Sequence, residues 1–378
     1  MMKEILVCNS AAISGVFAST GDPIVAGIKA YFDMINAQGG VNGYRFALNH
    51  MDDEYDPDIA QTCFEKLVFE EKAFAYISHF GAPVVRSTLK CIKETGIPVI
   101  GFATGVGELY SDGMRSDMRN VFPIQPVYIT EGRAMVARLI SMNQNKSISK
   151  IGMLYVDEST GRDIKNGVGI ESLLLDIDCE FQKINKSFDN VDVCARRIID
   201  SGADFIVVGA SQAYFARVIE ALVHHKNTKP VLTTYLNSVI TVAYQTDAVL
   251  QNLFDVYALS WLNYDDKRAL NLEIASEWLC DYAMNGYAHC GWISAHFFVE
   301  GIKRLGDAEL TWDNFIDAME QEDFEIPFGG KVSYKNGRRL GTLEMSIVQF
   351  DMTFPTGWRP VDGLKSFTEL LNMNQFYA

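Results

Sequence analysis

The sequence predicts an α/β protein with doubly wound parallel sheets in two lobes. Short apolar runs typical of buried strands alternate with segments whose apolar residues recur at helical spacing. This alternation is interrupted near residues 120–126 and then starts again. The length of 378 residues also exceeds what one hydrophobic core usually organises. The alternation, its restart and the length together predict two lobes of the same class.

The stretch at residues 75–83 is the clearest transition from a strand to a helix. Its first residues are apolar or aromatic, as in a strand that is covered on both faces. Gly81 and Ala82 allow a close backbone approach, and Pro83 suits the first helical position. The start of a helix carries unpaired N–H groups and partial positive charge. We therefore expect this place to receive a carboxylate or a phosphate.

The first lobe is expected to hold strands at residues 5–8, 46–50, 74–77 and 97–102. Asp22 with Pro23, and Asp56 with Pro57, are typical of helix starts, because the aspartate caps the helix and the proline fits its first position. Ligands of doubly wound sheets bind beyond the carboxyl ends of the strands. We therefore expect a site where three loops converge, at residues 9–21, 79–82 and 102–107.

The second lobe repeats this pattern after a crossing segment at residues 120–126 that contains two prolines. Its strands are expected at residues 150–156, 179–184, 204–209 and 231–234. Its edge loops are expected at residues 157–161, 209–212 and 235–238. The remaining expectations are a second crossing strand at 254–259, a hairpin at 329–337 that turns at Asn336-Gly337, and a final strand at 343–350.

The composition argues against several classes of protein. The net charge of −15, from 33 basic and 48 acidic residues, opposes binding to nucleic acid or to an anionic membrane surface. The sequence has no run of about 18 apolar residues that would span a bilayer. The 7 cysteines show no C-x-x-C spacing, which argues against zinc and thioredoxin chemistry.

Sequence motifs for catalysis and for metal binding are missing. We find no G-x-S-x-G, no H-E-x-x-H, no Walker loop and no complete dinucleotide fingerprint after the first strand. His224 and His225 are neighbours, so on a helix they cannot share a metal, and we expect them to mark a solvated helix end. Asp52, Asp53 and Asp56 are not followed by further ligands at calcium-loop spacing. We therefore expect a binding protein, not an enzyme, with no catalytic residues, no metal and no cofactor.

A series of short segments resembles one known family in its order and spacing. The segments are Ser14-Gly15, Gly21-Asp22, Gly27, the run at 35–43, the D-D-x-x-D-P run at 52–57, Gly291-Trp292 and Phe328-Gly329-Gly330. Together they resemble the type I periplasmic solute-binding proteins of the leucine/isoleucine/valine-binding kind, which serve branched-chain amino acid ABC transporters. The resemblance covers nearly the whole chain.

The resemblance implies two lobes that are joined by a three-strand hinge and close on a ligand. We expect lobe 1 to comprise residues 1–122 plus 258–333, and lobe 2 to comprise residues 123–257 plus 334–378. By motif match, Phe80, Gly81 and Ala82 form the loop that takes a carboxylate. Phe102, Ala103 and Thr104 form the next loop, which takes an ammonium group. Phe17, Thr20 and Tyr264 are further expected ligand-binding residues of this lobe.

The chain departs from the family's pattern at several expected site positions. Ala82 stands where a serine is frequent, so only its backbone N–H can donate. In the second lobe, Thr160 and Ser211 replace two tyrosines of the family. Tyr235 replaces the acidic residue that receives the ammonium group, which leaves Asp157 and Glu158 as nearby candidates. The family's first-lobe disulfide would fall at Tyr55 and Gly81, and both cysteines are missing together.

The expected function is that of an extracytoplasmic receptor that binds a small, mainly apolar amino acid, most simply a leucine-like one, and delivers it to an ABC transporter permease. We expect a periplasmic protein or a cell-surface lipoprotein whose leader is not part of this sequence. Two alternatives stay open. The same scaffold would bind an aromatic carboxylate or an amide, or it would act as a ligand sensor for a protein partner.

Overall fold

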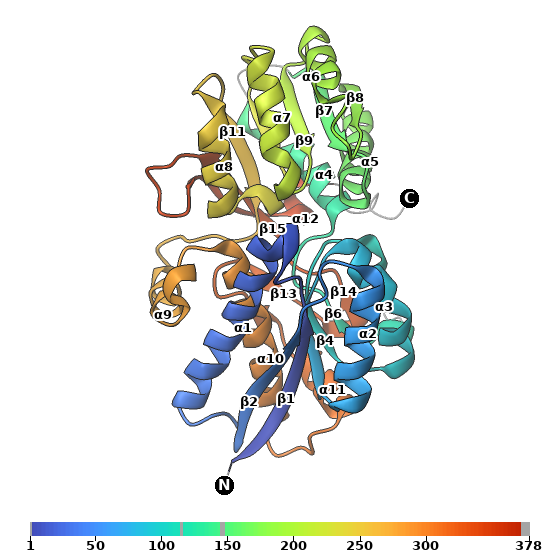
Figure 1. Cartoon of the computed structure of the whole chain (residues 1–378), viewed down its shortest axis with the longest axis vertical. Helices are drawn as coiled ribbons and strands as arrows, with labels where there is room; N and C mark the ends of the chain where they lie inside the picture. The colour runs from blue at the N-terminus through green and yellow to red at the C-terminus, as the bar shows by residue number, and fades with distance from the viewer. Residues whose placement is uncertain (1, 114–115, 144–147, 372–378) are drawn as a thin grey trace. The chain divides into compact units, whose positions relative to one another are not determined.

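The computed structural model describes residues 2–113, 116–143 and 148–371. The chain divides into two compact units (Figure 1). Unit 1 comprises Met1–Gln125 and Tyr264–Thr342, and unit 2 comprises Pro126–Asn263 and Leu343–Ala378. The predicted α/β class with two parallel-sheet lobes is confirmed.

Unit 1 is built on a parallel sheet with the strand order β2-β1-β3-β4-β6. Its strands are β1 (Lys3–Ser10), β2 (Tyr44–Met51), β3 (Ala75–Phe80), β4 (Val99–Ala103) and β6 (Val121–Phe122). One face of this sheet is covered by α1 (Ala18–Ala37) and α10 (Gly286–Leu305), and the other by α2 (Pro57–Glu65) and α3 (Ala82–Thr95), as Figure 1 shows. The sheet is therefore doubly wound, as predicted.

Unit 2 is built on a mixed sheet with the strand order β16-β15-β11-β10-β9-β7-β8. Its strands are β7 (Lys150–Val156), β8 (Asp178–Ile184), β9 (Phe205–Gly209), β10 (Val231–Thr233), β11 (Val256–Ser260), β15 (Glu344–Phe350) and β16 (Trp358–Ser366). The helices α4 (Tyr128–Met142) and α5 (Ser159–Leu174) pack together on one face of the sheet. The helices α6 (Val191–Asp200), α7 (Gln212–His224) and α8 (Ile240–Leu250) form a second packed group.

Several smaller elements complete the two units. Three further helices are α9 (Ala269–Leu279), α11 (Trp312–Met319) and α12 (Phe367–Leu370). Two short antiparallel pairs join β12 (Phe324–Glu325) to β13 (Lys331–Val332), and β14 (Arg338–Arg339) to β5 (Ser111–Asp112). Short helical turns occur at Gly15–Phe17, Lys66–Glu70, Gly107–Leu109, Ser116–Met118, Tyr235–Asn237, Cys280–Tyr282 and Lys335–Gly337.

In each unit, glycines allow a pair of helices to approach unusually closely. In unit 1, a Cβ on Gly27 would lie 1.9 Å from the carbonyl oxygen of Ala288, and one on Gly291 would lie 2.0 Å from that of Ile24. In unit 2, a Cβ on Gly132 of α4 would lie 2.2 Å from the carbonyl oxygen of Ile164 in α5. A Cβ on Gly167 of α5 would lie 2.1 Å from the carbonyl oxygen of Ile129 in α4. Only glycine fits such contacts, so these residues hold each helix pair together over its sheet.

The first helix begins earlier than the predicted cap at Asp22. It starts at Ala18, directly after the turn Gly15–Phe17, and Pro23 lies inside it. Gly21 packs against the loop after β1, where a Cβ would lie 1.9 Å from the carbonyl oxygen of Ala12. Asp22 accepts a hydrogen bond from the Tyr282 hydroxyl instead of capping the helix. Packing against that loop therefore decides where the helix begins, and the local Asp-Pro signal does not.

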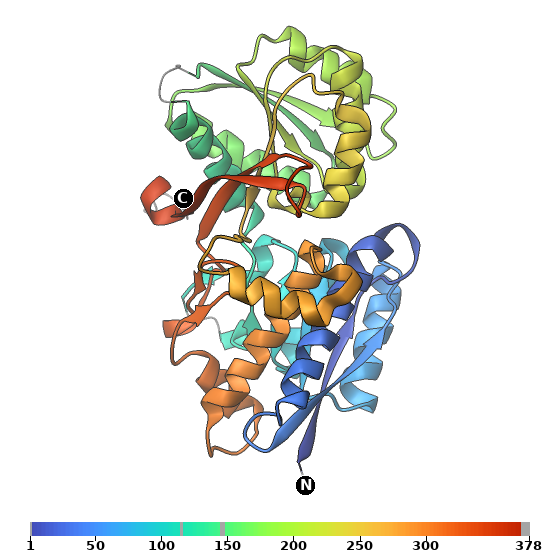
Figure 2. The ribbon, with the colours of Figure 1, turned by 90° about the vertical axis from the view of Figure 1, so that its left-hand side faces the viewer.

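The C-terminal third differs most from its sequence-based prediction. Asn336 and Gly337 form a turn with φ values of 58° and 74°, but its flanking strands do not pair with each other. The strand before the turn pairs with β12, and the strand after it pairs with β5, so the predicted hairpin is wrong. The hairpin that does form joins β15 to β16, and β16 was not predicted. It lies at one edge of the unit 2 sheet (red in Figure 2).

The chain passes from one unit to the other at positions that differ from the expected ones. The expected boundaries lie after residues 122, 257 and 333, whereas those of the structure lie after residues 125, 263 and 342. The second boundary moves because β11 pairs with both β10 and β15, and so belongs to the unit 2 sheet. The third moves because Arg339 is held in unit 1 by an ion pair of 2.6 Å with Glu320.

Candidate functional site

Both units share the strand order 2-1-3-4 at their parallel core. Unit 1 has its topological switch point between β1 and β3, and unit 2 has the corresponding point between β7 and β9. In open α/β sheets, ligands bind beyond the carboxyl ends of the strands at such a point. The loops after these four strands are therefore the places where a ligand-binding site is expected in each unit.

The switch point of unit 1 carries an aromatic cluster made of Phe17, Tyr55 and Phe80. The rings of Phe17 and Tyr55 are stacked, with centroids 3.9 Å apart. Phe80 ends β3 and lies 5.3 Å from the ring of Tyr55 and 6.2 Å from that of Phe17. Phe17 and Phe80 were predicted as site residues, and the structure brings them together through Tyr55. Such ring pairs stabilise by about 0.5–1.5 kcal/mol beyond the area they bury.

Three aspartates hold the segment that presents Tyr55. Asp52 accepts the backbone N–H groups of Ile13 and Glu54, which ties the loop after β1 to the loop after β2. Asp53 is fully buried, accepts the Ser10 hydroxyl at 2.8 Å and the Tyr55 N–H at 3.0 Å, and has its pKa raised by burial to about 6. Asp56 caps α2 as predicted. Each carboxylate thus has a structural role.

Gly81 joins the aromatic cluster to the start of α3. It is the N-cap of α3 and has a φ of 91°, a conformation that favours glycine. A Cβ at this position would lie 2.3 Å from Cε2 of Tyr55. Positions 55 and 81 are therefore in contact, where the resemblance places the family's disulfide. In this chain the tyrosine ring fills the space left by the missing side chain, and all 7 cysteines are free thiols.

The carboxyl ends of β3 and β4 lie side by side in unit 1. Phe80 is in register with Ala103, and the Gly81 N–H donates to the Ala103 carbonyl oxygen at 3.4 Å. The Gly81 N–H, which belongs to the predicted carboxylate loop, is therefore already engaged in a hydrogen bond within the protein. The following first-turn N–H groups of α3, beginning with Ala82, have no acceptor within the helix because of helix geometry.

Three other predicted site residues of unit 1, Thr20, Phe102 and Thr104, are almost fully buried. Thr20 and Thr104 are each 1% exposed, and Phe102 is 1% exposed within β4. Tyr264 packs on Phe328, with ring centroids 5.9 Å apart, and its hydroxyl donates to Nδ1 of buried His289 at 2.5 Å. The Nε2 of His289 faces the Ala283 carbonyl oxygen at 2.9 Å, which assigns the N–H to that nitrogen. Tyr264 is thereby fixed within unit 1.

The switch point of unit 2 is polar and carries an acid. Glu158 follows β7 as the N-cap of α5, and its Oε1 accepts the Ser211 hydroxyl at 3.1 Å. Burial raises the pKa of Glu158. Its neighbour Asp157 is instead occupied by ion pairs with Arg162 at 2.8 Å and Lys183 at 3.2 Å. Of the two acids considered from the sequence, Glu158 is the one that the structure joins to a predicted site residue.

Tyr235 is held on a second acid that sequence reasoning missed. Glu131, in the first turn of α4, is fully buried and accepts the Tyr235 N–H at 2.6 Å and the Thr234 hydroxyl at 3.0 Å. Burial raises the pKa of Glu131 to about 8. The Tyr235 hydroxyl donates to the Pro126 carbonyl oxygen at 3.2 Å, and its ring stacks on Tyr128 at 6.0 Å. Thr160, the second residue of α5, is 7% exposed.

The missed residues had different signals in the sequence. Tyr55 lies inside the acidic D-D-x-x-D-P run, where a tyrosine flanked by capping aspartates could have been chosen. Glu131 had no such signal, because an acid in the first turn of a helix ordinarily faces solvent and favours the helix dipole. Two depressions among the described residues are lined by other side chains, including Tyr31 and Trp292 in unit 1 and Phe188 and Arg217 in unit 2.

Comparisons with known proteins agree with this architecture. The curated Leu/Ile/Val-binding protein homolog 2 of Brucella abortus is 32% identical over 101 residues, so the aligned stretch spans only 27% of either chain. A branched-chain amino acid ABC transporter structure from Thermus thermophilus with bound valine superposes with a TM-score of 0.83 at 16% identity, covering 99% of both chains.

Two further solved structures share the fold. A fatty acid ABC transporter substrate-binding protein from Thermomonospora curvata has a TM-score of 0.81 at 16% identity, covering 96% of this chain and 92% of its own. A solute-binding protein of an ABC transporter from R. palustris in complex with benzoate has a TM-score of 0.76 at 17% identity, covering 96% of each. These likenesses establish the type I periplasmic binding protein fold.

The family itself is assigned from the sequence. Residues 6–355 match the family described as periplasmic binding protein, which is nearly the whole chain. Among the described residues, no helix is long and apolar enough to cross a membrane. The doubly wound units, the switch-point loops and this match lead to one conclusion: the chain belongs to the periplasmic binding protein family, whose members are receptors and not enzymes.

Proposed function

We propose that this protein is the solute-binding receptor of an ABC transporter and that its ligand is a small amino acid of the branched-chain kind. In this proposal the two lobes close on the ligand, and the receptor then delivers it to a transporter permease. It works in the periplasm or at the cell surface. The observation that carries the proposal is the start of α3, where buried Gly81 and Ala82 follow β3 at the switch point of unit 1.

The ligand's carboxylate is proposed to bind at this helix start. The N–H groups of the first turn have no intrahelical acceptor, and the helix dipole adds partial positive charge there. Ala82 offers no side-chain donor, so its backbone N–H would carry the contact. The three structural neighbours support a carboxylate in general terms, since a fatty acid, valine and benzoate all carry this group.

The ligand's ammonium group needs hydrogen-bond acceptors. On unit 1, Thr104 follows β4 and is proposed to offer its hydroxyl oxygen, with the Ala103 carbonyl oxygen beside it. On unit 2, Glu158 is proposed to supply the negative charge that the family places at the position of Tyr235. Burial raises the pKa of Glu158, and an ammonium group nearby would favour its charged form again. Tyr235 is proposed to contribute ring surface only.

A second candidate ligand is an aromatic carboxylate. The aromatic cluster of Phe17, Tyr55 and Phe80 favours it, because stacked and edge-on rings bind another ring well. The benzoate complex of the R. palustris neighbour shows that this fold accommodates such a ligand. A benzoate-type acid would use the helix start in the same way but would leave Glu158 without a cation.

The ligand class is tested with compounds that differ by one charged group. Leucine, leucinamide, 4-methylpentanoate and benzoate are each added to ligand-free protein, and the thermal unfolding midpoint is measured. A bound ligand raises this midpoint according to its excess over the dissociation constant. We expect leucine to raise it most, and the two leucine analogues to raise it much less. A shift with benzoate and none with leucine would select the second candidate, and no shift with any carboxylate would exclude both.

A further inference from the structure

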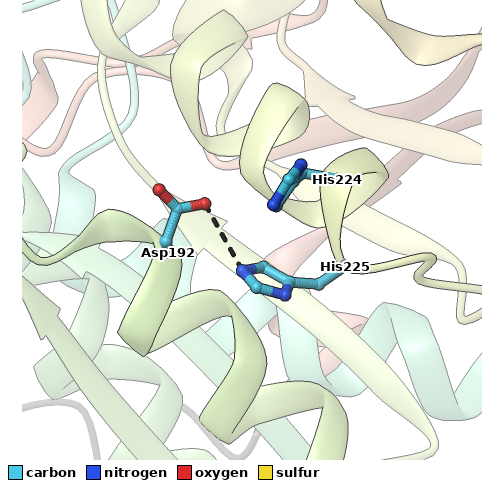
Figure 3. Close-up of side chains that lie close together, drawn as sticks. All are labelled: Asp192, His224 and His225. Atoms are coloured by element: carbon cyan, nitrogen blue, oxygen red, sulfur yellow. Dashed lines mark ion pairs between the residues drawn. The ribbon is translucent and has the colours of Figure 1, made fainter.

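We propose that Asp192, His224 and His225 in unit 2 bind one divalent transition-metal ion such as Zn²⁺. Their ligand atoms, one from each residue, all lie within 4.8 Å of one another. Figure 3 shows the carboxylate of Asp192 on α6 facing the imidazole of His225, with the ring of His224 beside it. This site lies outside the loops of the proposed ligand-binding function and is independent of it.

The two histidines lie together at the end of α7. His224 is the last residue of α7, and His225 is its C-cap, with φ −88° and ψ 14°. At this helix end the two ring centroids lie 4.9 Å apart. Two imidazoles on one tetrahedral ion, with bonds of about 2.0–2.1 Å, have ring centres roughly 5 Å apart. The helix end expected from the sequence is confirmed, and a shared ion at this end is our proposal.

The contact between Asp192 and His225 has the spacing of two metal ligands. The Oδ1 of Asp192 lies 3.4 Å from the Nε2 of His225. A hydrogen bond between nitrogen and oxygen is about 2.7–3.2 Å long. Two ligand atoms on one tetrahedral Zn²⁺ lie roughly 3.3–3.4 Å apart. The distance is therefore compatible with two ligands of one shared ion.

An unpaired buried nitrogen points to the same conclusion. The Nε2 of His225 is buried and has no hydrogen-bond partner, although polar atoms in such positions are normally satisfied. A metal ion would satisfy this nitrogen and the carboxylate of Asp192 together. Imidazole nitrogen and carboxylate oxygen are ligands that Zn²⁺ takes in proteins.

The surroundings suit a cation that keeps some of its water. Both histidines lie at the C-terminal end of α7, where the helix dipole places partial negative charge. Asp192 and His224 line an open depression together with Glu220 and Arg217, so water can complete the coordination. The guanidinium group of Arg217 makes a cation–π contact with Phe188, with 5.3 Å between its Cζ and the ring centroid.

The test is calorimetric titration of the full chain, prepared without a histidine tag, with ZnCl₂. We expect one ion per chain with a dissociation constant in the micromolar range. His224→Ala and His225→Ala should each weaken binding at least tenfold, and Asp192→Asn at least threefold. Asp200→Asn, at the other end of α6, is the matched control and should leave the dissociation constant unchanged. Cys280→Ser should also leave it unchanged, which separates this site from an exposed thiol.

The outcomes decide the proposal in both directions. Thermal unfolding of each variant without metal checks that it folds, and the exposed His224 is the substitution least expected to disturb packing. Zn²⁺ should raise the unfolding midpoint of the wild-type protein and not that of His224→Ala. The proposal is overturned if Zn²⁺ shows no saturable binding, or if binding survives both histidine substitutions undiminished.

Discussion

The switch points of the two units share a strand order but differ in chemistry. In unit 1, the loops after β1 and β3 bring together aromatic rings and a helix start, and its acids are tied up in backbone contacts. In unit 2, the loops after β7 and β9 bring together Glu158 and Ser211, and a second buried acid supports Tyr235. In the proposed function, unit 1 therefore receives an anionic and apolar group, and unit 2 receives a cationic one.

If the proposed ligand is right, this difference adapts one fold to a ligand with two opposite charges. The shared topology fixes where the loops lie, and the loop residues decide which charge each unit receives. In our proposal, Glu158 takes the role of the acid that the family places at position 235. Glu158 lies at the carboxyl edge of the same sheet, in the loop after β7. The following changes test the two switch points separately, from the largest expected effect to the smallest.

Gly81→Ala should be the most damaging change at the switch point of unit 1. The alanine would have to adopt the φ of 91° that Gly81 has. Its Cβ would lie 2.3 Å from the ring of Tyr55. Strain and overpacking together should lower the free energy of unfolding by about 3 kcal/mol. Urea unfolding followed by circular dichroism measures this.

The control for that change is Gly43→Ala. Gly43 has a φ of 80° but no atom within 4 Å of its Cβ position. It should cost only the strain, about 1 kcal/mol. Equal losses in the two variants would show that contact with Tyr55 does not matter. Partial recovery in Gly81→Ala combined with Tyr55→Ala would confirm that it does.

Glu131→Gln should destabilise the switch point of unit 2. Below about pH 8 one oxygen of the buried carboxyl group carries a proton, and glutamine places an NH₂ group there. The second hydrogen of this NH₂ group has no acceptor among the two known contacts, so we expect a loss of about 1 kcal/mol near neutral pH or below. Chemical unfolding measured at several pH values tests this. A loss below about 0.5 kcal/mol at pH 5 would show that the carboxyl group does not hold this loop.

The pH dependence of the same variant gives a second test. Burial raises the pKa of Glu131 to about 8, so the folded state holds its proton more tightly than the unfolded state does. Its contribution to stability is fully present below the unfolded value of 4.5 and is lost as the pH rises through about 8. The difference between wild type and Glu131→Gln should therefore shrink from pH 5 to pH 9. If the difference in unfolding free energy between the two proteins grows from pH 5 to pH 9, the pKa of Glu131 is not raised in the folded state.

Thr104→Val should have a smaller effect, confined to the ligand. The substitution keeps the shape of a side chain that is 1% exposed and removes its hydroxyl. Loss of one hydrogen bond to a charged group should weaken leucine binding by about 2 kcal/mol, which is roughly thirtyfold. Isothermal titration measures the affinity. Thr246→Val in α8, at a fully buried threonine away from the switch point, should leave it unchanged.

Much of this fold follows from the sequence, because the signals are local. Buried strands such as β3 and the Asp56-Pro57 helix start are set by residues close together in the chain, and both were predicted correctly. The start of α1, the partners of the strands around Asn336-Gly337 and the place of β11 depend on distant segments. Turn chemistry alone does not tell a strand which partner it will pair with.

The site divides in the same way. The positions of Phe17, Phe80 and Gly81 follow from strand ends and from a resemblance in motif. The ring of Tyr55 in the space beside Gly81, and the bonds of Glu131 to Tyr235, join residues 26 and 104 positions apart and have no local signature. The helix end at His224 and His225 was predicted, but the proximity of Asp192 on α6 to these residues has no local signature.

The most direct test of the two-charge account is calorimetric titration of Glu158→Gln with leucine and with 4-methylpentanoate. Removing the charge of Glu158 should weaken leucine at least tenfold and leave 4-methylpentanoate, which has no ammonium group, within a factor of two of its wild-type affinity. An unchanged affinity for leucine would show that unit 2 does not receive the ammonium group. Equal weakening of the binding of both compounds would show that Glu158 supports the fold of the site and does not interact with the ammonium group.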